Sequence, residues 1–161
     1  MLAPGFMKKL VRKPPGHSYM TTVRQLLKEK GHNVFTVGPG ETVFDAIRKM
    51  ADENIGSLIV CEGTKLIGII TERHYARNVF LKGRASPSTL VQDIMETQVL
   101  FARPDQSVDE CMAVMTEKRI RHLPVMDQEK LIGIISIGDL VKNIIRDQKF
   151  TIDQLTHFIS S

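Results

Sequence analysis

The sequence has no tryptophan, only two cysteines and no long hydrophobic run. Cys61 and Cys111 form no CxxC pair and have no histidine at metal-ligand spacing, which argues against a disulfide framework and a zinc site and indicates a reducing compartment. The longest apolar stretches, such as Leu66–Ile70, have about five residues, whereas a membrane-spanning helix needs about 20. The sequence therefore predicts a soluble globular protein without a transmembrane segment.

Acidic residues are absent before Glu29. Residues 1–33 carry a net charge of +6, so the rest of the chain, whose total is +4, carries −2. Pro4-Gly5 and Pro14-Pro15-Gly16 interrupt any helix in the leader, which also lacks the apolar core of a secretion signal. We interpret residues 1–19 as a flexible basic arm on a cytoplasmic protein, with a transit peptide as the weaker alternative. The slightly acidic body does not favour nucleic-acid binding.

The body of the chain is an internal repeat. An offset of 65 residues aligns residues 34–76 with 99–141 without a gap, and 13 of the 43 positions are identical. The longest identical run is Lys65–Ile70, matched by Lys130–Ile135. A chain of 161 residues is close to the usual size of one domain, so we expect the two units to share one core.

Each unit predicts the order strand, helix, strand, strand, helix. Short strands are expected at 34–37 and 99–102, and the helices that follow begin at Thr42 and Ser107, each with an acid three residues on. Apolar residues then recur at helical spacing. Two apolar runs around a polar turn predict a buried hairpin at 58–71 and again at 123–136, and closing helices follow at 73–80 and 138–147. The fold class is α+β, with two pseudo-symmetric units.

Short helical patterns precede the units at 23–27 and 91–95, and the linker between the units is Gly83–Thr89. We assign residues 20–84 to the first unit and residues 85–147 to the second. The apolar residues between Phe150 and Ile159 have helical spacing, so residues 148–161 are assigned to a C-terminal helical tail. We expect this tail to pack on the module or on a partner.

These residues resemble the CBS domain family, named for cystathionine beta-synthase, whose members nearly always occur as tandem pairs. The resemblance covers Val23–Arg146 and includes no catalytic or transport domain. The family signature is a glycine, two apolar residues, Thr or Ser, two variable residues and an Asp. Gly133–Asp139 matches it in full, whereas Gly68–His74 ends in histidine. The resemblance therefore identifies a stand-alone CBS pair.

The resemblance implies that the chain binds an adenosine phosphate, because family members bind AMP, ADP, ATP, NAD-type dinucleotides or S-adenosylmethionine. Gly133 would let a ligand approach the backbone, Ser136 would favour a phosphate at a helix N-terminus, and Asp139 would accept from both ribose hydroxyls. By register, the favoured site would contain Phe35, Thr36, Val37, Ile55, Gly56, Ser57, Gly133, Ile134, Ser136 and Asp139.

A second and weaker site is implied at the mirror position, with Leu100, Ala102, Ile120, His122, Thr71 and His74. It should be weaker because a neutral imidazole offers one acceptor where a carboxylate offers two oxygens. In similar proteins the ligand phosphates gather in a central cleft, which implies phosphate contacts from Arg73, Arg119, Arg121 and His122. The alternative for each arginine is a solvated side chain at the start of a strand.

No catalytic residue and no metal site are expected. Ser136, Asp139 and His122 lack a nucleophile elbow and an oxyanion hole. His74 and His122 have no carboxylate or thiol at ligand spacing. Our hypothesis is a regulatory adenine-nucleotide sensor without catalysis, which the resemblance implies to be a disc-shaped homodimer acting on a target protein. A structural dimerisation module with a vestigial ligand site, and nucleic-acid binding through the basic arm, stay open.

Overall fold

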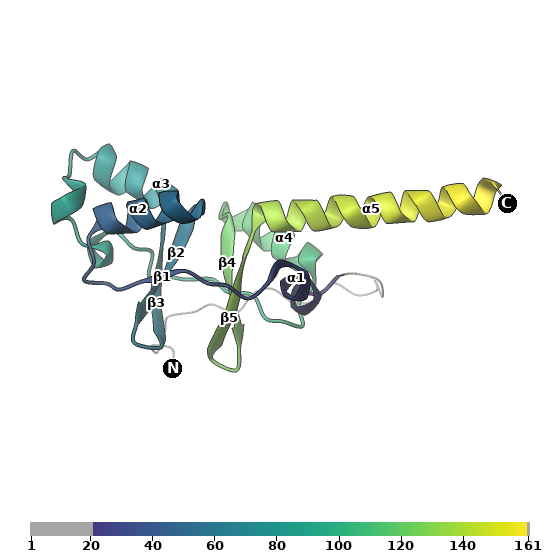
Figure 1. Cartoon of the computed structure of the whole chain (residues 1–161), viewed down its shortest axis with the longest axis horizontal. Coiled ribbons are helices and arrows are strands. Elements are labelled where there is room, and N and C mark those ends of the chain that lie inside the picture. Colours follow the sequence, from purple (N-terminus) through teal and green to yellow (C-terminus); the bar gives the residue numbers. More distant parts are fainter. Residues whose placement is uncertain (1–20, 161) are drawn as a thin grey trace.

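The computed structural model describes residues 21–160 and shows two lobes side by side, with a long helix projecting from the second (Figure 1). The predicted basic arm, residues 1–19, lies outside the described residues. The first half contains α1 (Val23–Lys30), β1 (Thr36–Val37), α2 (Val43–Glu53), β2 (Ser57–Glu62), β3 (Lys65–Thr71), α3 (Glu72–Tyr75) and a π-helical turn, η1 (Ala76–Phe80). The second half contains two 3₁₀ turns, η2 (Ser86–Ser88) and η3 (Val91–Asp93), followed by α4 (Val108–Lys118), β4 (His122–Asp127), β5 (Lys130–Ser136) and α5 (Ile137–Ser160).

The two antiparallel hairpins repeat each other, as the sequence predicts. The register of β2 and β3 shifts between Val60 and Cys61, and the register of β4 and β5 shifts at the equivalent step between Val125 and Met126. The helices that pack on these hairpins also begin as predicted. Thr42 Oγ1 accepts from the Asp45 amide, and Ser107 Oγ accepts from the Glu110 amide.

The first strand of each unit differs between the lobes. β1 runs parallel to β2, whereas its counterpart in the second lobe is reduced to a bridge between Ala102 and Val125. In the first lobe the Ile59 amide donates to the Phe35 carbonyl. The equivalent residue in the second lobe is Pro124, which has no N–H to donate. Both predicted first strands are therefore too long: residues 36–37 form a strand where 34–37 was expected, and only residues 101–102 form bridges where 99–102 was expected. In the second lobe the missing donor at Pro124 removes the equivalent of the Ile59 bond.

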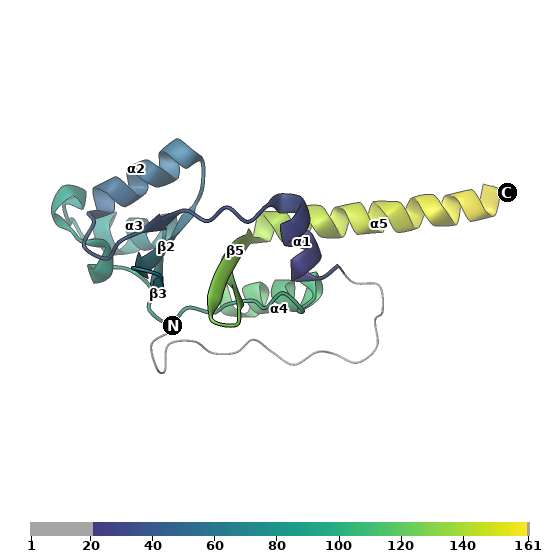
Figure 2. The same ribbon diagram turned by 60° about the horizontal axis from the view of Figure 1, so that its bottom comes forward.

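Each lobe is completed by a helical segment from the other half of the chain. In α1, Val23, Leu26 and Leu27 are buried in the core of the second lobe, while Val91 and Ile94 are buried in the core of the first. Figures 1 and 2 both show α1 beside β5 and α4. Equivalent backbone bonds hold the two segments: Val23 N donates to Gln106 O, and Val91 N donates to Glu41 O. Packing therefore does not follow the sequence boundary between residues 84 and 85.

The two lobes also share a small core between their hairpins. Ile59, Leu66 and Ile69 from the first hairpin are buried with Val99 and Met126 from the second half. This cluster joins the inner faces of the lobes. The described residues do not form the one shared core expected from the sequence: each lobe has its own core, and this small cluster and the exchanged segments join the two lobes.

The predicted C-terminal tail is a direct continuation of α5. This helix has 24 residues and no break at the predicted boundary of residue 148. Phe150, Ile152, Leu155, Phe158 and Ile159 are 57% to 81% exposed, so the tail does not bury them on its own module. Within residues 21–160, no helix is both long enough and apolar enough to span a membrane.

Candidate functional site

A cavity of about 450 Å³ lies where the lobes meet. Its walls come from both halves of the chain, so neither lobe forms it alone. Ile69, Val99, Leu100 and Ile120 provide apolar surface. The other lining residues are Gly56, Thr71, Glu72, Arg73, His74, Glu96, Gln98, Arg119, Arg121 and His122.

This cavity brings together most of the residues expected at the weaker site and in the phosphate cleft. Five of the six residues of the weaker site line it, the exception being Ala102. Ala102 is fully buried in the core of the second lobe and does not line the cavity, and its place in a ligand site stays a prediction. The sequence reasoning missed Glu72, Glu96 and Gln98, because nothing in their local pattern distinguishes them from solvated polar residues.

Three arginines enter the cavity from two directions. Arg73 follows β3, whereas Arg119 and Arg121 precede β4. Arg73 Nη1 donates to the carbonyl of Arg119 at 2.9 Å, and this carbonyl belongs to the residue that ends α4 with a φ of 53°. The bond satisfies an acceptor at the end of the helix and holds the Arg73 side chain against the end of α4. With Glu72 and Glu96 opposing them, the lining carries a small excess of positive charge.

His74, the histidine that replaces the signature aspartate, closes a helix cap. The Thr71 amide donates to His74 Nδ1 at 3.1 Å, and the His74 amide donates to Thr71 Oγ1 at 3.2 Å. In the other lobe, the Ser136 amide donates to Asp139 Oδ2 and the Asp139 amide donates to Ser136 Oγ. The last position of both signatures is thus the third residue of a capping box. The Ser/Thr-x-x-Asp spacing is itself the signal for this role.

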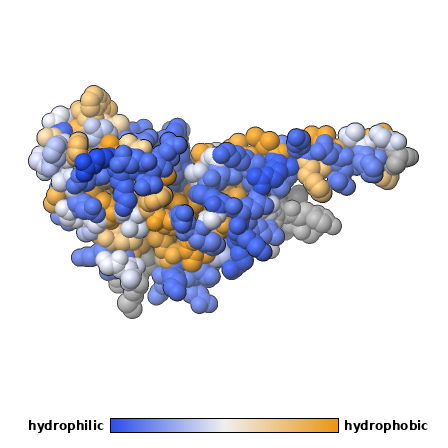
Figure 3. Space-filling model, in the orientation of Figure 1, coloured by the Kyte–Doolittle hydropathy of each residue, from blue (hydrophilic) through white to orange (hydrophobic). Residues whose placement is uncertain are grey.

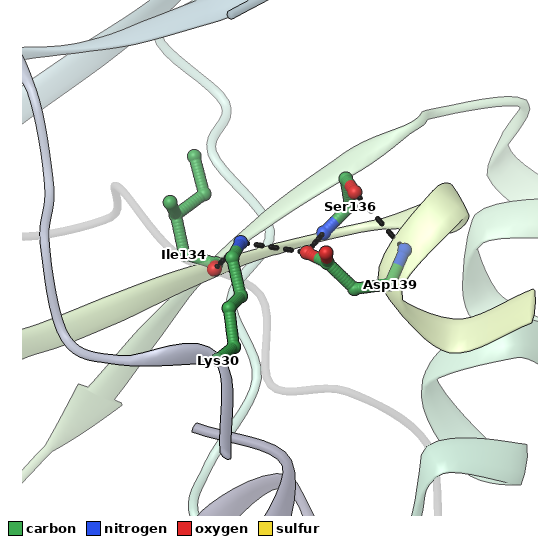
Figure 4. A network of polar contacts seen from close by, with 4 residues as sticks. All are labelled: Lys30, Ile134, Ser136 and Asp139. Atoms are coloured by element: carbon green, nitrogen blue, oxygen red, sulfur yellow. Dashed lines mark hydrogen bonds and ion pairs between the residues drawn. The ribbon is translucent and has the colours of Figure 1, made fainter. Parts of the chain in front are cut away.

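Asp139 is held by a cation from its own chain. Lys30 Nζ lies 2.6 Å from Asp139 Oδ2 and 2.6 Å from the carbonyl oxygen of Ile134 (Figure 4). Burial alone would raise the pKa of Asp139, but hydrogen bonds from Lys30 and the Ser136 amide lower it overall. The carboxylate expected to receive a ribose therefore already has an ionic partner.

Other residues of the favoured site are also engaged in the protein. A Cβ atom on Gly133 would lie 2.7 Å from Leu27 Cδ2, so this glycine makes room for α1, and its role in ligand approach stays a prediction. Val37 and Ser57 are buried, and Phe35 and Ile55 pack against the core of the first lobe. Gly56 lines the cavity on the His74 side instead. The Thr36 carbonyl accepts a hydrogen bond from Lys49.

Comparison with known proteins identifies the family. The CBS domain model matches residues 21–80 and again residues 91–146. The chain belongs to the CBS domain family. This CBS pair is 36% identical over 148 residues to the mitochondrial CBS domain-containing protein CBSX3 of Arabidopsis thaliana, covering 86% of this chain and 72% of the relative. The match confirms the tandem pair of CBS domains that the sequence predicts, and the fold confirms the predicted α+β class.

Solved structures give the same result. A protein with CBS domains from Burkholderia ambifaria matches this CBS pair with a TM-score of 0.77 and 53% identity, covering 80% of this chain and 96% of that one. Another CBS domain pair, solved in complex with 5′-methylthioadenosine and S-adenosyl-L-methionine, matches with a TM-score of 0.68 and 25% identity. It covers 77% of this chain and 95% of its own length.

The two cavity histidines of this CBS pair predict a pH-dependent stability. Burial lowers the pKa of His74 below its ordinary value of 6.5, with Glu96 opposing and Arg73 adding to the effect. Burial also lowers the pKa of His122, helped by Lys30 and opposed by Asp139. Below pH 6.5 the unfolded chain binds protons that the folded chain does not, so the free energy of unfolding should fall as the pH drops from 7 to 5.

The variant His74→Asp tests this assignment, because Asp139 shows that aspartate can form the same cap. Between pH 7 and 5 the free energy of unfolding of the variant should fall less steeply, and His122 should account for the slope that remains. Protonation of the introduced carboxylate should lower the free energy of unfolding only near about pH 4. Thermal unfolding across this range measures the slope. The exposed His157→Asn serves as the control and should match the wild type. An unchanged slope in His74→Asp would contradict the role of His74.

Proposed function

We propose that this protein is a non-catalytic regulatory CBS pair that binds an adenosine phosphate in the cavity at His74 and passes ligand occupancy to another protein. The observation that carries the proposal is the meeting of Arg73, Arg119 and Arg121 at one cavity. Guanidinium groups form strong, charge-assisted bonds with phosphate oxygens. The apolar wall of Ile69, Val99, Leu100 and Ile120 suits an adenine ring. A volume of about 450 Å³ is in the range of small-molecule sites.

The proposal reverses the order of the two sites implied by the resemblance. The Asp139 site has Lys30 bound to the groups that a ribose would use. A ligand there must displace an ion pair before it can bind, whereas the His74 cavity demands no such exchange. We therefore assign one preferred ligand per chain to the His74 cavity. The related pair that binds 5′-methylthioadenosine and S-adenosyl-L-methionine supports an adenosine ligand, with AMP, ADP, ATP and NAD as the phosphate-bearing candidates.

Signal transfer follows from the two-lobed wall of the cavity. A ligand that touches Arg73 and Arg121 contacts both halves of the chain, so its affinity depends on how the halves are placed. Occupancy then favours one arrangement of the lobes, in proportion to the difference in affinity. In the cytoplasm, a homodimer of such pairs could present the two arrangements to its target protein as different surfaces.

Thermal unfolding with AMP, ATP, NAD and S-adenosylmethionine tests the proposal. A ligand at a hundredfold excess over its dissociation constant should add about 2.7 kcal/mol to the free energy of unfolding. We expect the phosphate-bearing ligands to stabilise the protein more than adenosine does, and calorimetric titration to give one site per chain. Failure of all four ligands to stabilise the chain would favour the structural dimerisation module. Nucleic-acid binding that weakens with salt and is lost when residues 1–19 are deleted would favour the alternative of a nucleic-acid-binding protein that uses its basic arm.

A further inference from the structure

The second half of α5 lacks cover from the rest of the described chain. Every residue from Ile145 to Ser160 is exposed, a length of about 24 Å at 1.5 Å per residue. Apolar residues are visible along this projecting helix in Figure 3. The CBS domain model ends at residue 146, so most of this segment lies beyond the family match. An isolated helix of this length is marginal in water, because helices owe most of their stability to packing.

Five of the seven large exposed apolar residues of α5 follow a heptad repeat, and Phe150 and Phe158 lie off it. Spacings of four and three residues alternate along one side, which we call the seam: Val141, Ile145, Gln148, Ile152, Leu155 and Ile159. The five apolar members are 42% to 81% exposed. Alternating spacings of four and three residues place these side chains in one stripe along the helix, which is the pattern of paired helices in coiled coils. The seam begins on the module, beside the buried Leu140, and continues without a break to the end of the helix.

We propose that the seam pairs antiparallel with the seam of a second copy of this chain. If residue 150 lies at the twofold axis, Val141 faces the partner's Ile159 and Ile145 faces the partner's Leu155. Gln148 then faces the partner's Ile152, so no seam residue is left over. A twofold pair requires such a self-complementary surface. Each projecting half would lie on the anchored half of the other α5.

Charge favours the antiparallel direction. Lys142, Arg146 and Lys149 lie on one flank of the seam in its anchored half, and Asp153 lies on the same flank in the projecting half. With the axis at residue 150, antiparallel pairing brings Asp153 close to the partner's Arg146 and Lys149 and sets the helix dipoles in opposition. These contacts offset the proximity of Lys149 to the partner's Lys149 beside the axis. A membrane surface is a poorer occupant, because residues 150–160 contain no lysine or arginine.

Disulfide trapping tests the pairing in the full-length chain. In a Cys61→Ser background, the double variant Ile145→Cys, Leu155→Cys should form a covalent dimer on mild oxidation. The two cysteines cannot bond within one chain, because ten residues of helix separate them by about 15 Å. Each single variant is the matched control and should remain uncrosslinked. Circular dichroism confirms that the variants are folded.

Two results would overturn the inference. Dimers in Ile145→Cys alone would show parallel helices, since this residue would then face its own copy. If the double variant forms no dimer, the seam does not pair with a second copy, and its partner is residues 1–20 or another protein. The variant Leu155→Glu should weaken self-association at least tenfold in sedimentation experiments, whereas Gln154→Glu on the far side of the helix should not. This test needs no nucleotide, so its failure is distinct from failure of the proposed ligand site.

Discussion

Leu27→Ala is expected to lower the free energy of unfolding by about 2–5 kcal/mol. Leu27 is fully buried, and it anchors α1 in the core of the second lobe although it belongs to the first half of the sequence. Its loss would leave a cavity beside Gly133 and loosen the helix that completes this lobe. Urea unfolding measures the change. Lys28→Ala, the exposed next residue on the same helix, should change the free energy of unfolding by less than about 0.5 kcal/mol.

A double-mutant cycle with Gly133 tests the contact itself. A Cβ at residue 133 would lie 2.7 Å and 3.0 Å from the two terminal methyl carbons of Leu27, so Gly133→Ala alone should cost about 1–3 kcal/mol through overpacking. In the Leu27→Ala background the same methyl group would enter the vacated space. The double variant should therefore lose at least about 0.5 kcal/mol less than the two single losses combined. Strict additivity would mean that α1 does not pack on Gly133.

Arg121→Ala is expected to weaken AMP binding by about 10- to 150-fold, which corresponds to the loss of one charged hydrogen bond worth about 1.5–3 kcal/mol. Its side chain is exposed at the cavity, while its carbonyl accepts from the Ile137 amide through the backbone alone. Truncation should therefore spare the fold. Titration calorimetry with AMP measures the dissociation constant.

The control for Arg121 is Arg84→Ala, which removes the same charge from an exposed residue that does not line the cavity. Arg84→Ala should bind AMP within about twofold of the wild type, since exposed charges at a distance are screened by salt. Adenosine, which has no phosphate, should bind Arg121→Ala and the wild type with similar affinity. Equal losses for AMP and adenosine would place Arg121 at the base or the sugar instead of at a phosphate.

Local patterns in the sequence predicted the repeated parts of the fold. The two hairpins follow from the apolar runs around polar turns, and the starts of α2 and α4 follow from Thr42 and Ser107. These signals act over a few residues, so the sequence displays them directly. The resemblance to the family added the pairing of units and the set of candidate residues around the cleft.

Long-range contacts could not be predicted in the same way. Lys30 and Asp139 are 109 residues apart, and no local pattern links an exposed lysine at the end of α1 to a signature aspartate. The exchange of α1 and η3 was equally hidden, because helices before each unit fit either lobe by sequence alone. From the signature, His74 indicates the loss of a ligand-binding carboxylate, whereas in the structure its Nδ1 atom preserves the helix cap that aspartate makes in the other lobe.

The exchange of segments imposes an order on folding during synthesis. Val91 and Ile94 complete the first lobe soon after its own strands are made, but α1 is made first and packs against residues as late as Leu140. At roughly 5–20 residues per second, the apolar side of α1 would wait about 5–20 s on the ribosome before its partners emerge. During that interval Val23, Leu26 and Leu27 have no core to enter, so chaperones can bind a surface that the finished protein buries.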